Sequence, residues 1–140
     1  MAIVAPIVLK NSDQEVVVKV TGAAGDTSTI DIATLATANQ TQTGTATVNI
    51  AGIKYAGTTS SVVSITRDSN NIMTFSTEGV DGEDFASGWV DNQENTANID
   101  LAISGGTATV WLTLRKQAGF QSKIETGIYG VYDDETQVGA

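Results

Sequence analysis

Apolar and polar residues alternate with a period of two along most of the chain. In EVVVKVTG, Val16, Val18 and Val20 form one row, while Lys19 and Thr21 belong to the opposite row. Successive side chains of a β-strand point to opposite faces, so this pattern predicts a strand with one face on a core. The same alternation recurs at 28–32, 45–50, 98–104 and 107–116.

Turn-forming residues lie between several of these runs. The polar segment Asp68–Asn71 separates SSVVSITR from IMTFST and predicts a hairpin. The Gly-Gly pair at 105–106 predicts a second hairpin, in which 99–104 would pair with 107–116. Gly52 indicates a bulge or bend inside its own strand.

The pattern is strand-like almost throughout, and a helical turn or two competes only at Asp31–Asn39. The single proline, Pro6, indicates that the first strand lies at an edge or is irregular. Some seven to nine short strands at regular spacing predict an all-β antiparallel sandwich, of jelly-roll or immunoglobulin-like type. We expect this domain at 1–120, with 1–10 as an N-terminal strand or arm, and an acidic, glycine-containing C-terminal arm at 121–140.

Charge narrows the possible partners. The chain has 16 acidic and 7 basic side chains, a formal net charge of −9. Nucleic-acid backbones and anionic membranes both attract clustered Lys and Arg, so we expect neither as a direct partner. The apolar run at 2–9 lacks a basic segment before it, and no later run approaches the length of a membrane span. We therefore expect a soluble protein made in the cytosol without an export signal.

The residue inventory disfavours an enzyme. There is no cysteine and no histidine, which excludes disulfides, thiolate metal sites and Ser-His or Cys-His nucleophile pairs. Six carboxylates lie between 78 and 94, and all of them except Glu78 are candidate ligands of a calcium site. The spacing of an EF-hand is absent, however, and a solvated acidic loop is the simpler interpretation. Paired carboxylates could also serve glycoside hydrolysis, although one sequence does not set their separation. We expect no enzymatic activity, no cofactor and no metal. The six carboxylates are Glu78, Asp81, Glu83, Asp84, Asp91 and Glu94.

Trp111 stands in the threonine row of the 107–116 strand, opposite to its apolar row. A tryptophan buries about 150–250 Å², so a fully exposed indole forgoes several kcal/mol of apolar transfer at about 25 cal/mol per Å². The N-terminal run, the C-terminal tail or a neighbouring subunit could cover it, and we favour a partner surface. The candidate interface residues are Trp111, Arg115, Lys116, Phe120, Tyr129 and Tyr132.

A second aromatic group lies in the acidic stretch. Phe85, Trp89 and Asp91 could form a ligand loop in which aromatic faces stack on a sugar. The alternative is that Phe85 and Trp89 cover an open end of the sandwich, and we favour that alternative.

The second half of the chain, SVVSITRDSNNIMTFSTEG followed by GWVDNQENTANIDLAISGGTATVWLTLRKQAGF, resembles small virion structural proteins of tailed bacteriophages of marine or cyanobacterial type, over about residues 58–120. The elements of this pattern are Thr66-Arg67, Trp89, Asn95-Thr96, Ile99, Gly105-Gly106, Leu114-Arg115-Lys116 and Gly119-Phe120. The resemblance implies an all-β accessory protein of the virion without catalytic residues.

On this basis the sequence predicts a non-enzymatic virion protein, such as a capsid decoration protein, present as a homo-oligomer. Its partners would be the major capsid protein or proteins of the neck or tail. The alternative is a carbohydrate- or receptor-binding β-module of a fibre, neck or tail.

Overall fold

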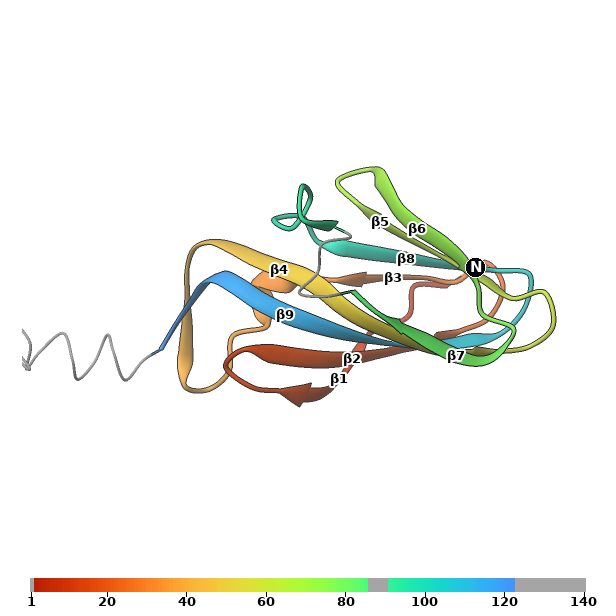
Figure 1. Ribbon diagram of the computed structural model, residues 1–140, viewed down its shortest axis with the longest axis horizontal. Coiled ribbons are helices and arrows are strands. Elements are labelled where there is room, and N and C mark those ends of the chain that lie inside the picture. The colour runs from red at the N-terminus through yellow and green to blue at the C-terminus, as the bar shows by residue number, and fades with distance from the viewer. Residues whose placement is uncertain (1, 86–90, 123–140) are drawn as a thin grey trace, which may run out of the picture.

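The computed structural model describes residues 2–85 and 91–122, and in this part of the chain nine strands form two antiparallel sheets (Figure 1). One sheet has the strand order β1-β2-β9-β4-β7, and the other has the order β3-β8-β5-β6. The strands are β1 (Ile7–Asn11), β2 (Glu15–Gly22), β3 (Thr27–Ile30), β4 (Gln40–Gly57), β5 (Val62–Arg67), β6 (Asn70–Ser76), β7 (Gly79–Asp84), β8 (Ile99–Ser104) and β9 (Ala108–Ser122). The two sheets pack face to face, which confirms the predicted antiparallel sandwich.

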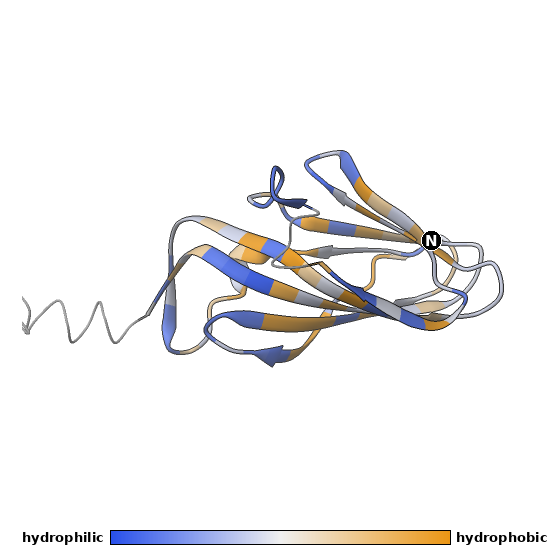
Figure 2. Ribbon diagram, in the orientation of Figure 1, coloured by the Kyte–Doolittle hydropathy of each residue, from blue (hydrophilic) through white to orange (hydrophobic). Residues whose placement is uncertain are grey.

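The core is built from the apolar rows that the sequence pattern identified. In the larger sheet Val16 lies opposite Leu114, and Val18 lies opposite Leu112, so their side chains share the inner face. The smaller sheet contributes the matching rows of β5 and β8, and apolar residues alternate with polar ones along the strands of both layers (Figure 2). The buried strand residues of the core are Val16, Val18, Val20, Ile30, Ala46, Val48, Ile50, Ile53, Val63, Ile65, Ile99, Leu101, Ile103, Ala108, Val110, Leu112 and Leu114.

The two long strands β4 and β9 form the centre of the larger sheet. Their register shifts at three places, one of them between Ile50 and Gly52, which confirms the bulge expected at this glycine. The paired strands continue to Gln40 and Ser122, so β9 runs two residues past the expected end of the sandwich domain.

The hairpin predicted around Asp68 is confirmed. β5 and β6 pair antiparallel, with Arg67 opposite Asn70. Asp68 and Ser69 both adopt positive φ, 51° and 64°, as a two-residue turn of the type favoured in hairpins requires. The connection is therefore shorter than the four residues expected from sequence, because β6 already begins at Asn70.

The second predicted hairpin is wrong. β8 lies in the four-stranded sheet and β9 in the five-stranded sheet, so the Gly105-Gly106 connection crosses between the layers. Gly105 has φ 77°, and a Cβ at this position would meet the carbonyl oxygen of Ser60. A glycine is required here for a close passage over the 58–61 turn, rather than for a strand reversal within one sheet.

The N-terminal and helical expectations are partly confirmed. β1 begins directly after Pro6 and forms one edge of the five-stranded sheet, as the proline indicated. Within the range where a helical turn was expected, Ile32–Thr34 forms a 3₁₀ turn, for which the Asp31 side chain accepts a hydrogen bond from the Ala33 amide. No helix in the described part of the chain is long and apolar enough to cross a membrane.

The acidic stretch is not simply a loop. Residues Gly79–Asp84 form β7, which pairs with β4 at the edge opposite β1. Neighbouring carboxylates such as Glu83 and Asp84 therefore project to opposite faces of the sheet. The described residues contain no group of three or more acidic side chains placed to hold a metal ion.

Candidate functional site: the outer face of the five-stranded sheet

Trp111 lies on the outer face of the five-stranded sheet, between two lysines. Lys19 of β2 pairs with it on one side and Lys54 of β4 on the other. Directly opposed residues of antiparallel strands project to the same face, so the half-buried indole is flanked by two ammonium-bearing side chains. The sequence pattern placed Trp111 on the correct face, but it could not supply the two lysines, because they come from strands distant in the chain.

A groove of about 420 Å³ runs beside the indole. The next row of the sheet consists of Val17, Thr113 and Gly52. Because Gly52 has no side chain, nothing projects into the groove at this position. Val80 of β7 borders the groove and is 83% exposed. The groove is lined by Val17, Gly52, Ile53, Lys54, Val80, Asp84, Trp111 and Thr113.

The accessible cations of the described chain are gathered on this outer face. Of the seven Lys and Arg side chains, Arg67 and Lys116 are buried and Lys123 lies outside the described residues. The remaining four all project outward from the five-stranded sheet, as their register with Val17, Trp111 and Glu15 places them. These four are Lys10, Lys19, Lys54 and Arg115.

Two carboxylates accompany these cations on the strands of the outer face. Glu15 forms an ion pair with Lys10, at 2.9 Å, and Asp84 borders the groove. Four positive and two negative side chains give this face a formal charge of +2, in a chain whose net charge is −9. The surface around Trp111 therefore has the opposite sign to the protein as a whole. We call it the Trp111 face, defined by Lys10, Glu15, Val17, Lys19, Lys54, Val80, Asp84, Trp111, Thr113 and Arg115.

The N-terminal run does not cover this face, which rules out one of the three possible covers for Trp111. β1 lies beside β2 as an edge strand, in the plane of the sheet, and Ile3 makes an isolated bridge with Thr27 of the other sheet. Ile7, Val8 and Leu9 are each about half exposed, at 51%, 47% and 53%.

Lys116, predicted at an interface, is instead a structural residue. It continues the inward-facing row of β9, and its Nζ donates to Asn11 Oδ1 at 2.8 Å, to the Ser12 carbonyl at 2.9 Å and to Gln40 Oε1 at 2.7 Å. The ammonium thereby joins the turn after β1 to the start of β4. Burial lowers the pKa of Lys116, an effect that the nearby Asp13 carboxylate opposes.

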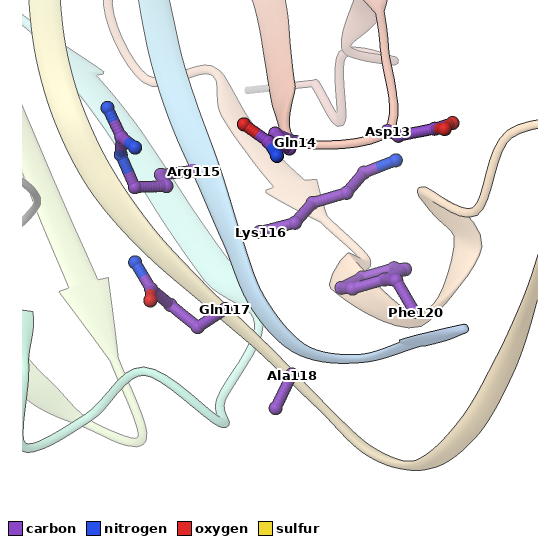
Figure 3. Close-up of a pocket in the computed structure, with 7 residues that line it drawn as sticks. All are labelled: Asp13, Gln14, Arg115, Lys116, Gln117, Ala118 and Phe120. Atoms are coloured by element: carbon purple, nitrogen blue, oxygen red, sulfur yellow. The ribbon is translucent and has the colours of Figure 1, made fainter. Parts of the chain in front are cut away.

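Arg115 and Phe120 border a second cavity, of about 360 Å³, near the turn between β1 and β2 (Figure 3). Arg115 projects to the opposite side of β9 from Lys116 and belongs to the exposed Trp111 face. Phe120 packs against the core, and the Lys116 ammonium lies 5.0 Å from its ring centroid. Of the candidate interface residues, Trp111 and Arg115 share one outer surface, Lys116 is buried, Phe120 is half-buried against the core, and Tyr129 and Tyr132 lie outside the described residues.

Asp91 is not available as a ligand residue, because it forms a buried ion pair with Arg67. Arg67 Nη1 lies 2.6 Å from Asp91 Oδ2, and neither side chain is exposed. The guanidinium also donates to the backbone carbonyls of Val48, Asn95 and Ala97. Burial raises the pKa of Asp91 and lowers the pKa of Arg67, and the ion pair between them opposes both effects.

This ion pair completes the edge of β4 beyond the end of β7. Phe85 N–H donates to the Ala51 carbonyl, where β7 stops. Farther along, the Ile50 amide donates to the Asp91 carboxylate, Val48 N–H donates to the Asn95 carbonyl, and the Val48 carbonyl accepts from Arg67. Segment 91–97 thus provides the hydrogen bonds that a further strand would have supplied. Trp89, the third residue of the predicted ligand loop, lies outside the described residues.

Comparisons with known proteins give similarities of overall shape alone. No protein-family model matches the chain, and no curated protein sequence does either. A cupin domain of Bordetella pertussis has 11% identity and a TM-score of 0.39, covering 82% of this chain and 94% of its own. PliG of Aeromonas hydrophila, a periplasmic inhibitor of g-type lysozyme, has 10% identity and a TM-score of 0.38, covering 84% and 100%. A cupin superfamily protein of Desulfitobacterium hafniense has 15% identity and a TM-score of 0.33, covering 82% and 78%. At these values no function transfers to this chain.

Proposed function

We propose that this protein is a non-enzymatic structural component of a tailed-bacteriophage virion, such as a capsid decoration or accessory protein, and that it binds its neighbours through the Trp111 face. The observation that carries the proposal is the half-buried indole on the outer side of a sheet, beside an open groove and between two lysines. The resemblance of residues 58–120 to small virion proteins supplies the biological setting.

The composition of this face suits a protein interface. Interface centres are enriched in tryptophan and arginine, and a few such residues supply most of the binding free energy. Here Trp111, Val17 and the highly exposed Val80 supply apolar surface, and Lys19, Lys54 and Arg115 surround it. Closing a partner over the groove would complete the burial of the indole and exclude water from the lysine pair.

The test is the composition of virions from a phage that encodes this chain. Quantitative mass spectrometry should find the chain in purified particles at many copies. Trp111→Ala should reduce that copy number strongly, while the melting temperature of the purified variant stays close to that of the parent. Ile3→Ala provides a matched control, because Ile3 is 88% exposed and lies away from the groove; its copy number should not change.

Two results would overturn the proposal. One is the absence of the chain from particles whose genome encodes it. The other is a combination of two observations: Trp111→Ala melts far below the parent, and Lys19→Glu/Lys54→Glu is incorporated normally. The first would show that Trp111 stabilises the fold, and the second would show that the face has no binding role.

A carbohydrate- or receptor-binding module is the second candidate, favoured by one feature of the groove. Lys54, Asp84 and Thr113 line the same groove as the indole and carry hydrogen-bonding groups, and an aromatic face with polar groups nearby suits a sugar ring. A glycan array probed with the parent chain and with Trp111→Ala separates the candidates: binding that depends on Trp111 would favour the module, and no binding would favour the virion interface.

A further inference from the structure

We infer that the Trp111 face is occupied by the acidic C-terminal segment, residues 123–140, of a second copy of this chain. This inference rests on the proposed function only in assigning the face to binding, and it names the occupant. The C-terminal segment and the Trp111 face are opposite in charge, both contain apolar residues, and the length of the segment favours binding to a second copy.

The Trp111 face and the C-terminal segment have opposite charges. The face has a formal charge of +2 and holds all four of the cations that remain accessible in the described chain. Residues 123–140 contain four carboxylates against one lysine, and Asp133, Asp134 and Glu135 are consecutive. Opposite potentials steer two surfaces together and suppress wrong pairings.

The apolar content of the segment is the second argument. Directly before the three acids the chain reads IYGVY, Ile128 to Tyr132. The groove beside Trp111 offers Val17 and Val80 as apolar contacts, and Lys19 and Lys54 flank the indole in its own row of the sheet. An extended segment can therefore place its aromatic part on the indole and groove while its acids reach Lys19 or Lys54.

Reach favours a second copy over the same copy. Trp111 lies eleven positions before Ser122 along β9, and the described chain stops at Ser122. Tyr132 is only ten residues beyond Ser122, and a chain extends at most about 3.3–3.6 Å per residue. A segment folding back on its own sheet would have no residues left for the reversal if Tyr132 were to meet Trp111. The segment of a neighbouring copy has no such restriction.

A symmetric contact between two Trp111 faces is disfavoured by the same charges. It would bring Lys19, Lys54 and Arg115 of one copy against the same cations of the other, and like charges facing each other across an interface are unfavourable. Exchange of the acidic segments avoids this repulsion and gives each copy an opposite charge.

The experiment is a charge swap in the full chain, read by sedimentation velocity across a concentration series. Lys19→Glu/Lys54→Glu reverses the face, and Asp133→Lys/Asp134→Lys reverses the segment. We expect the parent to self-associate. Each variant alone should associate at least about tenfold more weakly than the parent. The two variants mixed in equal amounts should associate again, because each then offers the other a complementary face and segment.

A milder pair of variants guards against a general effect of net charge. Lys19→Gln/Lys54→Gln lowers the net charge by two on the face, and Asn70→Asp/Ser104→Asp lowers it by two in the four-stranded sheet. The first should weaken association, and the second should leave it unchanged. Circular dichroism of each variant establishes that it is folded.

Three outcomes would overturn the inference: a parent that stays monomeric at every concentration, association that the reversed face leaves unaltered, or failure of the mixture to restore it. The proposed function is tested separately by virion content. A monomeric parent that is nevertheless incorporated through Trp111 would retain the virion role and assign the face to another virion protein.

Discussion

Arg67 and Asp91 form an ion pair of 2.6 Å with both side chains fully buried, and together they provide hydrogen-bond partners for the backbone of β4 beyond the end of β7. The guanidinium donates to three backbone carbonyls besides the carboxylate, so its removal leaves several buried acceptors without a partner. Removing either partner of such a pair is destabilising, because it leaves an uncompensated charge in the interior.

The first prediction concerns this pair. Arg67→Lys should lower the free energy of unfolding by roughly 2–4 kcal/mol, because one ammonium cannot serve the geometry that the planar guanidinium serves. Asp91→Ala should cost about 3–5 kcal/mol by leaving Arg67 buried without its counter-ion. Urea denaturation of both variants measures this. Losses below 0.5 kcal/mol in both, roughly the effect of an ordinary surface substitution, would contradict the structural role.

The second prediction concerns pH. Burial lowers the pKa of Lys116 in the folded chain below its ordinary value of 10.5. Between the lowered pKa and 10.5 the unfolded chain binds more protons than the folded chain, so the contribution of Lys116 to the free energy of unfolding increases as pH rises through that window. Lys116→Met should remove this component. The measurement is the difference between the urea stabilities of parent and variant at several alkaline pH values, with Lys54→Met as the exposed control. A difference that does not vary with pH, or that varies in the opposite direction, would contradict the assignment.

The third prediction compares two glycines with positive φ. Gly105 and Gly79 have φ 77° and 85°, but a Cβ at Gly79 meets nothing within 4 Å, whereas a Cβ at Gly105 meets the Ser60 backbone. Gly79→Ala should cost about 1–2 kcal/mol from backbone strain alone. Gly105→Ala should cost at least about 3 kcal/mol, since the clash is with main chain that cannot rotate away. Equal melting temperatures for the two variants would show that the crossover is less constrained than the structure indicates.

The sequence predicted the layers of this fold better than their connections. Rows such as Val16, Val18 and Val20 are local, and a period of two suffices to place them on the inner face. The Gly105-Gly106 connection was misjudged because the same two residues suit a hairpin and a passage between sheets. The choice between a hairpin and a passage between sheets depends on which strand pairs with β8. That strand is β5, which is distant in the sequence.

The candidate site was predicted only in part, because some of its residues come from strands that are distant in the sequence. The alternation correctly placed Trp111 outward, yet its neighbours Lys19 and Lys54 become visible only through the register of three strands. For Arg67 and Lys116 the signal was present in the sequence. Both continue inward-facing apolar rows, after Ile65 and after Leu114, and this position indicates a buried cation with partners rather than a surface charge.

The most direct test of the account is the accessibility of Trp111 itself. In a full chain carrying Trp89→Phe, Trp111 is the only tryptophan, and its fluorescence reports on this face alone. On association, the emission should shift to shorter wavelength and acrylamide quenching should decrease, and Lys19→Glu/Lys54→Glu should abolish both changes. Emission and quenching that are the same in the dissociated and associated protein would contradict a binding role for the Trp111 face.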